Sequence, residues 1–231
     1  MSEHVPARAL APAVAVIIPA LDAAATLPAT LAALGGAAAE IVVADGGSAD
    51  ATAAVARAAG ARVLAAPRGR GVQMAAGIAA TWAPWLLLLH ADTRLAPGWE
   101  APAGALMVAG EARAGYFRFA LDSADPRARR LERLVAWRCR ALGLPYGDQG
   151  LLLPRALLAA VGGMRPLPLM EDVDLVRRLG RRRLVPLDAA AVTSAARWER
   201  EGWRRRSARN LACLGLYAAG MPPRVLVRLY A

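Results

Sequence analysis

The first ninety residues alternate short apolar strands with helical segments, and this alternation limits the chain to few architectures. Buried strands are predicted for four apolar runs, at residues 14–19, 40–44, 62–66 and 85–89. Helices are predicted between them, from the spacing of Leu27, Leu31 and Leu34 and at residues 50–59 and 69–80. Connections this short allow only right-handed βαβ crossovers, so we predict a parallel, doubly wound sheet.

The remainder of the chain is less regular. Extended segments are expected at 115–121, 147–153 and 183–187, and helices at 126–142, 169–178 and, broken by Pro222 and Pro223, 201–230. A length of 231 residues suits one α/β domain. We predict a single domain over 1–231, with a nucleotide-binding half (14–92), an acceptor and catalytic half (93–200) and a helical tail (201–231).

The net charge of +11 is concentrated in the second half of the sequence. Residues 1–126 contain 8 arginines and 10 acidic residues, whereas residues 127–231 contain 21 arginines and 8 acidic residues. A strongly basic half favours polyanionic partners. The chain has no lysine, however, so genomic base composition is an alternative explanation for its many arginines.

Two features of the sequence concern its location in the cell. Its longest apolar runs fall short of a membrane span, no secretory signal precedes them, and Cys139 and Cys213 are the only cysteines, which predicts a cytoplasmic protein. The tail joins Arg204, Arg205 and Arg206 to an apolar stretch at 211–221. This composition suggests weak peripheral contact with an anionic inner-membrane face, but packing of the apolar side on the domain is the favoured alternative.

The ends of the predicted strands carry the informative side chains. Ligands of doubly wound sheets bind beyond the carboxyl ends of the strands, where Asp45 and Asp92 both lie. Asp45 is followed by Gly46 and Gly47, which let a ligand approach the backbone at the start of a helix. Ser48 and Asp50 are equally good helix caps. A GxGxxG fingerprint is missing from the first turn, which argues against a Rossmann oxidoreductase.

His90 and Asp92 are two residues apart after the fourth strand, so their side chains share one face. A carboxylate in this place suits Mg²⁺ or Mn²⁺, which bridge to substrate phosphates, although an isolated aspartate also forms turns. Farther along the chain, Glu171, Asp172 and Asp174 begin a helix. They stabilise the helix N-terminus by charge, and Asp172 is also the natural candidate for a general base.

Four segments in order, VAVIIPALD, IVVADGGSADAT, LLLLHADT and MEDVDL, resemble the family 2 glycosyltransferases of GT-A fold. The resemblance covers roughly residues 14–200. It implies a Rossmann-like, mostly parallel sheet flanked by helices, here with a basic helical C-terminal tail. The compact chain is similar to a small bacterial subgroup without transmembrane helices, some of whose members are linked with arsenosugar biosynthesis.

The resemblance also implies roles for individual residues. The donor would be a nucleotide sugar, most simply a UDP-sugar, bound by Pro19, Ala20, Asp22, Asp45, Gly46, Arg68, Arg70, His90 and Asp92. Asp92 would hold the metal, and Asp172 would deprotonate the acceptor. Acceptor-side positions would be Asp148, Gln149, Glu171, Arg197 and Trp198. His90 departs from the family's first DxD acid and Asp22 from a frequent Asn, which leaves the role of His90 open.

The sequence therefore predicts inverting, metal-dependent sugar transfer to a hydroxyl acceptor. A nucleotidyltransferase acting on a sugar phosphate is one alternative, but the glycine-rich basic loop it needs is replaced by Ala20-Leu21-Asp22-Ala23. A non-catalytic basic protein that binds membrane or nucleic acid is another. Only residues 197–209 interleave arginine with tryptophan, so we expect no nucleic-acid partner. The sugar, the acceptor, the preferred metal and the oligomeric state stay open.

Overall fold

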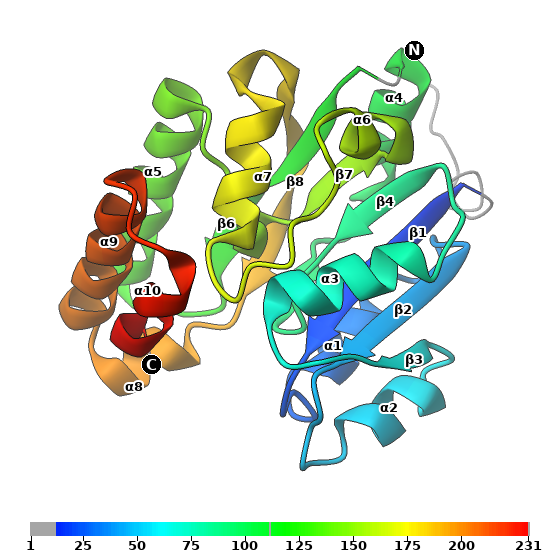
Figure 1. Cartoon of the computed structure of the whole chain (residues 1–231), viewed down its shortest axis with the longest axis horizontal. Helices are drawn as coiled ribbons and strands as arrows, with labels where there is room; N and C mark the ends of the chain where they lie inside the picture. Colours follow the sequence, from blue (N-terminus) through cyan, green and yellow to red (C-terminus); the bar gives the residue numbers. More distant parts are fainter. Residues whose placement is uncertain (1–12, 111, 231) are drawn as a thin grey trace.

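The computed structural model describes residues 13–110 and 112–230, which form an eight-stranded sheet flanked by helices (Figure 1). The strand order is β3-β2-β1-β4-β7-β6-β8-β5. The strands are β1 (Val14–Ala20), β2 (Glu40–Asp45), β3 (Arg62–Ala65), β4 (Trp85–Leu88), β5 (Thr93–Leu95), β6 (Ala114–Leu121), β7 (Leu151–Pro154) and β8 (Leu184–Thr193). The α-helices are α1 (Leu27–Ala32), α2 (Thr52–Ala58), α3 (Arg70–Ala79), α4 (Glu100–Ala109), α5 (Pro126–Leu142), α6 (Arg155–Ala160), α7 (Glu171–Leu179), α8 (Ala196–Glu201), α9 (Trp203–Ala218) and α10 (Pro223–Tyr230). Short 3₁₀ turns η2 (Gly147–Gln149) and η3 (Arg181–Arg183) precede β7 and β8.

The predicted parallel sheet is confirmed in the first half of the chain. β1 pairs in parallel with both β2 and β4, and β2 pairs in parallel with β3. Every residue of β1 is buried, because helices cover both faces of the sheet. Val16 and Ile18 face one core cluster, while Ala15 and Ile17 face the other. The second cluster includes Met74 of α3, which crosses the sheet in front of β1 and β2 in Figure 1.

The second half of the sheet mixes strand directions. β7 runs antiparallel to β4 and β6, β8 is parallel to β6, and β5 is antiparallel to β8. The register of β6 and β8 shifts between Phe117 and Arg118. The sheet as a whole is the mostly parallel arrangement that the sequence predicted for a GT-A fold.

Several boundaries in this half correct the sequence prediction. β5, α4 and α6 were not predicted, because β5 has three residues and the helices are rich in alanine and leucine without a clear polar face. The segment expected to be extended from Gly147 begins instead with the turn η2, and its strand starts at Leu151. Helix α7 begins two residues later than expected, because Met170 adopts a left-handed conformation with φ of 64°. β8 extends six residues beyond the predicted end, to Thr193.

The C-terminal tail packs on the domain, which was the favoured alternative to contact with a membrane. Helix α9 buries Trp203, Arg206 and Cys213, and α10 buries Leu226. Arg206 pairs with Glu201 at 3.2 Å, so the arginine cluster expected at a membrane surface is divided between solvent and an internal ion pair. In the part of the chain that the structure describes, no helix combines the length and apolar character required for a membrane crossing.

Candidate active site

Asp22 and Asp45 are held in place by the loops that follow β1 and β2. The Asp22 amide donates to Ser48 Oγ at 2.9 Å, and the Ala49 amide donates to the Asp22 carboxylate at 2.8 Å. Ser48 also donates from its amide (3.2 Å) and hydroxyl (2.5 Å) to Asp45 Oδ1. These bonds join two loops from neighbouring strands into one rigid edge. Ser48 therefore acts as a bridge between the loops rather than as the cap of α2.

Asp50 belongs to the same edge. Its carboxylate accepts from the amides of Ala24 (3.0 Å) and Thr52 (2.9 Å) and from the Thr52 hydroxyl. The bond from the hydroxyl is the largest cause of the lowered pKa of this exposed carboxyl, and the bonds from the amides lower it further. The N-cap residue of α2 is Ala51, which has no side-chain bond to the helix. Asp50 therefore does both: it satisfies the first amide of α2, as a capping residue would, and it bridges to the loop after β1.

Gln73 of α3 connects the ends of β1 and β2 through its side chain. Its Nε2 donates to the carbonyls of Ala20 and Ala44, each at 2.7 Å, and the side chain is buried. A Cβ on Gly46 would lie 3.1 Å from the Gln73 amide group, so the glycine leaves room for this contact. Pro19 and Ala20, which were predicted to line the nucleotide pocket, have buried side chains within β1. They lie at the expected edge of the sheet, but only their backbone borders it.

The first turn of α3 connects the donor side of the sheet to α7. Arg70 Nε lies 2.9 Å from Glu171 Oε1, whose side chain is almost completely buried. Burial raises the pKa of Glu171 to about 7, and Asp172 adds to this, while the Arg70 charge opposes it. The Gly71 amide donates to the Leu167 carbonyl at 3.2 Å, and a Cβ on Gly71 would lie 2.4 Å from that oxygen. The first turn of α3 is therefore in direct backbone contact with the loop that precedes α7.

His90 and Asp92 follow the end of β4, and both line the same cleft. Burial lowers the pKa of His90 to about 4, with Arg70 as the next cause, and the carboxylates of Asp92 and Asp172 oppose the shift only in part. The imidazole is therefore neutral at pH 7. The carboxylate of Asp92 is partly exposed and has no side-chain hydrogen bond within 13–110 and 112–230.

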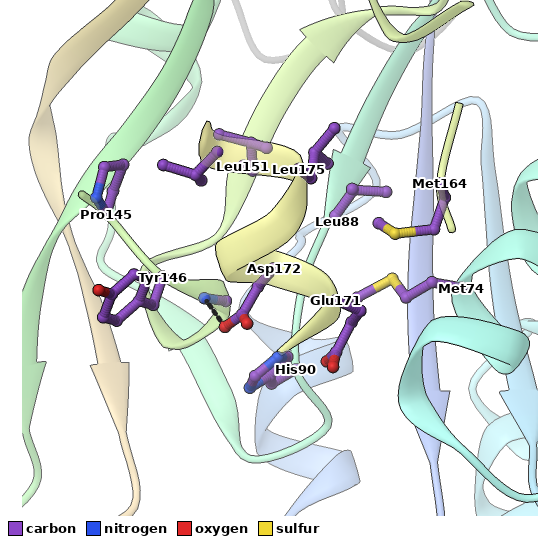
Figure 2. A pocket seen from close by; sticks show the side chains of 12 residues that line it. Met74, Leu88, His90, Pro145, Tyr146, Leu151, Met164, Glu171, Asp172 and Leu175 are labelled. Atoms are coloured by element: carbon purple, nitrogen blue, oxygen red, sulfur yellow. Dashed lines mark hydrogen bonds between the residues drawn. The ribbon is translucent and has the colours of Figure 1, made fainter. Parts of the chain in front are cut away.

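Asp172 lies in the first turn of α7, and its carboxylate is oriented by two backbone amides. Oδ2 accepts from the Gly147 amide at 2.7 Å (Figure 2), and Oδ1 accepts from the Val173 amide at 2.7 Å. Each carboxylate oxygen has a further lone pair with which to accept a proton. A Cβ on Gly147 would lie 2.4 Å from His90 Nε2 and 3.1 Å from Asp172 Oδ2. Only glycine fits between the imidazole and the carboxylate.

Asp174, two residues farther along, has a different environment. Its carboxylate pairs with Arg165 at 2.9 Å and with Arg178 at 2.7 Å. Because both oxygens are engaged in these ion pairs, Asp174 stabilises the packing of α7. Of the three acids in this helix, Asp172 is the one whose carboxylate lines the cleft.

The turn η2 places Asp148 and Gln149 differently. Asp148 lines the cleft, and burial raises its pKa to about 6, with Asp172 and Asp92 contributing and Arg138 opposing. Gln149 is buried, and its amide donates to the Phe117 carbonyl at 3.0 Å while accepting from the Tyr146 amide at 3.3 Å. The acceptor role predicted for Gln149 is therefore replaced by a structural role within the turn.

A cleft of about 500 Å³ opens between α5, α7 and α9. Seven predicted site residues line it, namely Arg70, His90, Asp92, Asp148, Asp172, Arg197 and Trp198. The predicted donor-side residues Pro19, Ala20, Asp22, Asp45, Gly46 and Arg68 lie outside it. Glu171 also lies outside and borders a smaller cavity of about 20 Å³ with His90 and Asp172, shown in Figure 2. An acceptor-side role for Glu171 is therefore not what the geometry supports.

Arg197 and Trp198, at the start of α8, lie in different environments. Arg197 is exposed at the cleft and has no hydrogen bond or ion pair with the described residues. Trp198 is 9% exposed and stacks on Trp203, with ring centroids 6.5 Å apart. Trp198 therefore forms part of the cleft wall rather than a free platform.

Sequence reasoning missed three residues that shape the site. No feature of the sequence identifies Gln73 as a site residue, because a helical pattern does not show which glutamine reaches the ends of two strands. Arg138 was one among many arginines of its helix, yet it lies 3.9 Å from the centroid of the Tyr146 ring in the cleft wall. The close packing of Gly147 follows only from its tertiary neighbours, although the neighbouring Asp148 and Gln149 were predicted as site residues.

The available metal ligands suit an ion that shares its coordination with a substrate. Within 13–110 and 112–230, no three His, Cys, Asp or Glu side chains gather closely enough to hold a metal by themselves. Mg²⁺ is commonly bound by one or two carboxylates together with waters and substrate phosphates. The partly exposed carboxylate of Asp92 fits this mode of binding and does not fit a closed protein cage.

Solved structures share the fold of the chain. The Mn²⁺, UDP and glucosyl-3-phosphoglycerate complex of glucosyl-3-phosphoglycerate synthase from Mycobacterium tuberculosis has a TM-score of 0.55 and 21% identity, covering 81% of this chain and 72% of that one. Mannosyl-3-phosphoglycerate synthase from Rubrobacter xylanophilus has a TM-score of 0.60 and 18% identity, covering 90% and 75%. These likenesses identify the GT-A fold.

Sequence comparison gives the family. No curated protein matches the chain significantly. The family model described as glycosyl transferase family 2 matches residues 15–160, which is more than half of the chain. This protein belongs to glycosyl transferase family 2.

Proposed function

We propose that this glycosyltransferase moves a sugar from a UDP-sugar to an acceptor hydroxyl with inversion, and that Asp172 is the general base. The observation that carries the proposal is the placement of Asp172. Its carboxylate lines the cleft that also contains Asp92, and it is oriented by the amides of Gly147 and Val173. A general base needs this combination of a fixed direction and access to the substrate.

The donor side of the proposal rests on the edge formed by Asp22, Asp45 and Gly46. The loops there are joined by side-chain hydrogen bonds, so the free backbone groups have fixed positions. Family membership supports a nucleotide sugar as donor, and the M. tuberculosis synthase crystallised with Mn²⁺ and UDP-glucose supports UDP. Arg68 is exposed beside this edge and suits phosphate binding. This proposal keeps the division into a donor half (14–92) and an acceptor half (93–200).

The metal would be held by Asp92. A divalent cation bound there would supply positive charge to stabilise the leaving diphosphate. Arg70 adds positive charge on the same side, next to the neutral imidazole of His90. On the acceptor side, Asp172 accepts the proton of the attacking hydroxyl. One carboxylate base with this orientation suits a single displacement, which inverts the anomeric centre.

The test measures binding rather than turnover. Wild-type protein should show stabilisation by UDP that increases when Mn²⁺ is added, since a ligand at about 100 times its Kd raises the unfolding free energy by about 2.7 kcal/mol. Asp92→Asn should lose the metal-dependent part. Asp188→Asn, at an exposed position of β8, is the matched control and should behave as wild type. Equal UDP stabilisation with and without Mn²⁺ in both wild type and Asp92→Asn would contradict the proposed metal site.

A further inference from the structure

The walls of the cleft are unusually apolar for a site that binds a sugar acceptor. Helix α5 contributes Leu131, Leu134, Val135, Trp137 and Leu142, and α9 contributes Leu211 and Leu214. In Figure 1 these two helices stand side by side at one end of the sheet. A purely sugar-binding surface needs hydrogen-bonding groups for its hydroxyls, and these side chains offer none.

The apolar walls continue to the outer surface of the protein. Leu134 is 65% exposed, Trp137 58% and Leu211 69%. These three side chains also line the cleft, so together they form its outer rim. Exposed apolar groups gathered around an opening mark a binding surface for apolar ligands or partners, unlike apolar residues scattered singly.

The inner end of the cleft is polar and contains the reacting groups. Asp92, Asp148 and Asp172 interact electrostatically there, together with Arg70, Arg138 and Arg197. A molecule that fills the apolar part of the cleft can therefore extend to Asp172, the proposed base. A protein partner or a second copy of the chain seated across the rim would instead close the way to Asp172.

We propose that the acceptor is an amphiphile, whose apolar chain lies between α5 and α9 and whose polar head presents its hydroxyl to Asp172. This inference rests on the proposed function. In the transfer, the head-group oxygen forms a bond to the anomeric carbon of the donor. The bond from that carbon to the diphosphate oxygen breaks, and its electron pair leaves with the diphosphate. Asp172 receives the proton of the hydroxyl.

Arg197 completes the chemistry of the head-group site. Its guanidinium is exposed at the cleft, has no partner among the described side chains, and lies close enough to influence the charge of His90. A guanidinium in this place offers several donors to head-group oxygens. The site thus joins an apolar wall to a polar end, which is the arrangement an amphiphile requires.

The closing experiment separates the chain from the head group. Calorimetric titrations would compare hexyl and octyl β-D-glucoside, hexyl and octyl phosphate, and the chainless controls glucose and inorganic phosphate, all below micelle concentrations and without donor. Burial of each methylene raises affinity by up to about fourfold, so octyl compounds should bind up to about 15-fold more tightly than hexyl compounds. The two series show whether a neutral or an anionic head is preferred.

Matched variants place the chain in the cleft. Trp137→Ser combined with Leu211→Ser should abolish the dependence on chain length. Trp82→Ser combined with Val108→Ser should leave it intact, because Trp82 (90% exposed) and Val108 (83% exposed) are apolar surface residues outside the cleft. All four positions are exposed, so folding is preserved, which thermal unfolding would check.

Binding of UDP with Mn²⁺, measured on the same samples, distinguishes failure of the amphiphilic acceptor from failure of the proposed function. Retained UDP binding without any dependence on chain length overturns the amphiphilic acceptor and leaves the proposed function standing. Loss of chain-length dependence in both variant pairs also overturns it, since the chain then binds elsewhere. A dimer that is abolished by the Trp137 and Leu211 substitutions would assign the rim to a second copy instead. Absence of UDP binding in folded wild type contradicts the proposed function itself.

Discussion

The edge proposed to bind the donor and the cleft proposed to bind the acceptor, called the donor edge and the acceptor cleft below, use their polar groups in opposite ways. At the donor edge, Asp22, Asp45 and Ser48 satisfy one another across two loops. In the cleft, Asp148 Oδ1 and Tyr146 Oη are buried without a hydrogen-bond partner among the described residues. A buried polar group without a partner costs free energy, so proteins retain one where function requires it. The donor edge is thus built in advance, whereas the cleft completes its contacts with a bound molecule.

The largest effect should come from the carboxylate that faces the cleft. Asp172→Asn removes the proton acceptor but preserves size, so turnover should fall by roughly 10²-fold or more. The affinity for UDP should stay near wild type, because a general base lowers the barrier without binding the donor. Initial rates measured beside UDP titrations would check both values.

Asp174→Asn is the matched control for that variant. It lies on the same helix but breaks two ion pairs, with Arg165 and Arg178, so the loss should appear in the free energy of unfolding. A folded, inactive Asp174→Asn protein beside an active Asp172→Asn protein would show that the wrong carboxylate was chosen.

Two buried glutamines test whether the donor edge and the cleft are independent. Gln73→Leu removes the side-chain donor to the carbonyls of Ala20 and Ala44, of which the Ala20 carbonyl keeps its bond from the Gly46 amide. Gln149→Leu removes the side-chain donor to the Phe117 carbonyl. Each should lower the free energy of unfolding by about 1–3 kcal/mol, the cost of removing the partner of buried polar groups. Urea denaturation measures that cost.

The two substitutions should differ in their effect on ligands. Gln73→Leu disturbs the strand ends beside Asp45 and should weaken UDP binding, whereas Gln149→Leu disturbs the turn below Asp172 and should lower turnover only. Equal weakening of UDP binding in both variants would show that donor edge and cleft form one unit.

The smallest effect concerns Asp148 and depends on pH. Burial raises the pKa of Asp148 to about 6 in the folded protein, from 3.8 for an unperturbed aspartate, so the folded state binds the proton more tightly. Stability from this group is therefore present at low pH and is lost as the pH rises from about 4 to about 6. Asp148→Asn should be more stable than wild type above that range by on the order of 1–2 kcal/mol, after allowance for solvent in the cleft.

Urea unfolding at a series of pH values, with chelator present, measures this difference. The gain should disappear near pH 4, where both proteins carry a neutral side chain. Asp188→Asn, exposed on β8, should follow the wild-type curve. A constant difference between wild type and Asp148→Asn at every pH would assign the effect to packing rather than to charge.

The sequence predicted most of the first half of the fold, because its strands are buried on both faces and read as continuous apolar runs. It predicted the second half less well. β5 pairs only through residues nearly one hundred positions away, such as Thr93 with Thr193, and no local pattern encodes such a partner. Met170 delays the start of the expected helix by two residues, through a left-handed conformation that a methionine rarely adopts.

The site was predictable where chemistry lies at strand ends and unpredictable where it depends on contacts across the fold. Asp92 and Asp172 were identified from their positions in short motifs, and both line the cleft. Glu171 and Gln149 had equally suggestive positions, but burial directs them into the structure. The apolar walls from α5 and α9 were not anticipated, since an amphipathic helix normally turns its apolar side toward the core.

The backbone contact between Gly71 and Leu167 has a consequence for how the protein can be recombined. Gly71 follows Arg70 in the first turn of α3, and Leu167 precedes the helix that carries Asp172. A chimera joined near residue 92 would take these two surfaces from different parents, and any side chain larger than glycine at position 71 would collide with the foreign backbone. Exchange of donor specificity between relatives therefore requires that residues 164–180 travel with residues 14–92, although the two segments are far apart in the sequence.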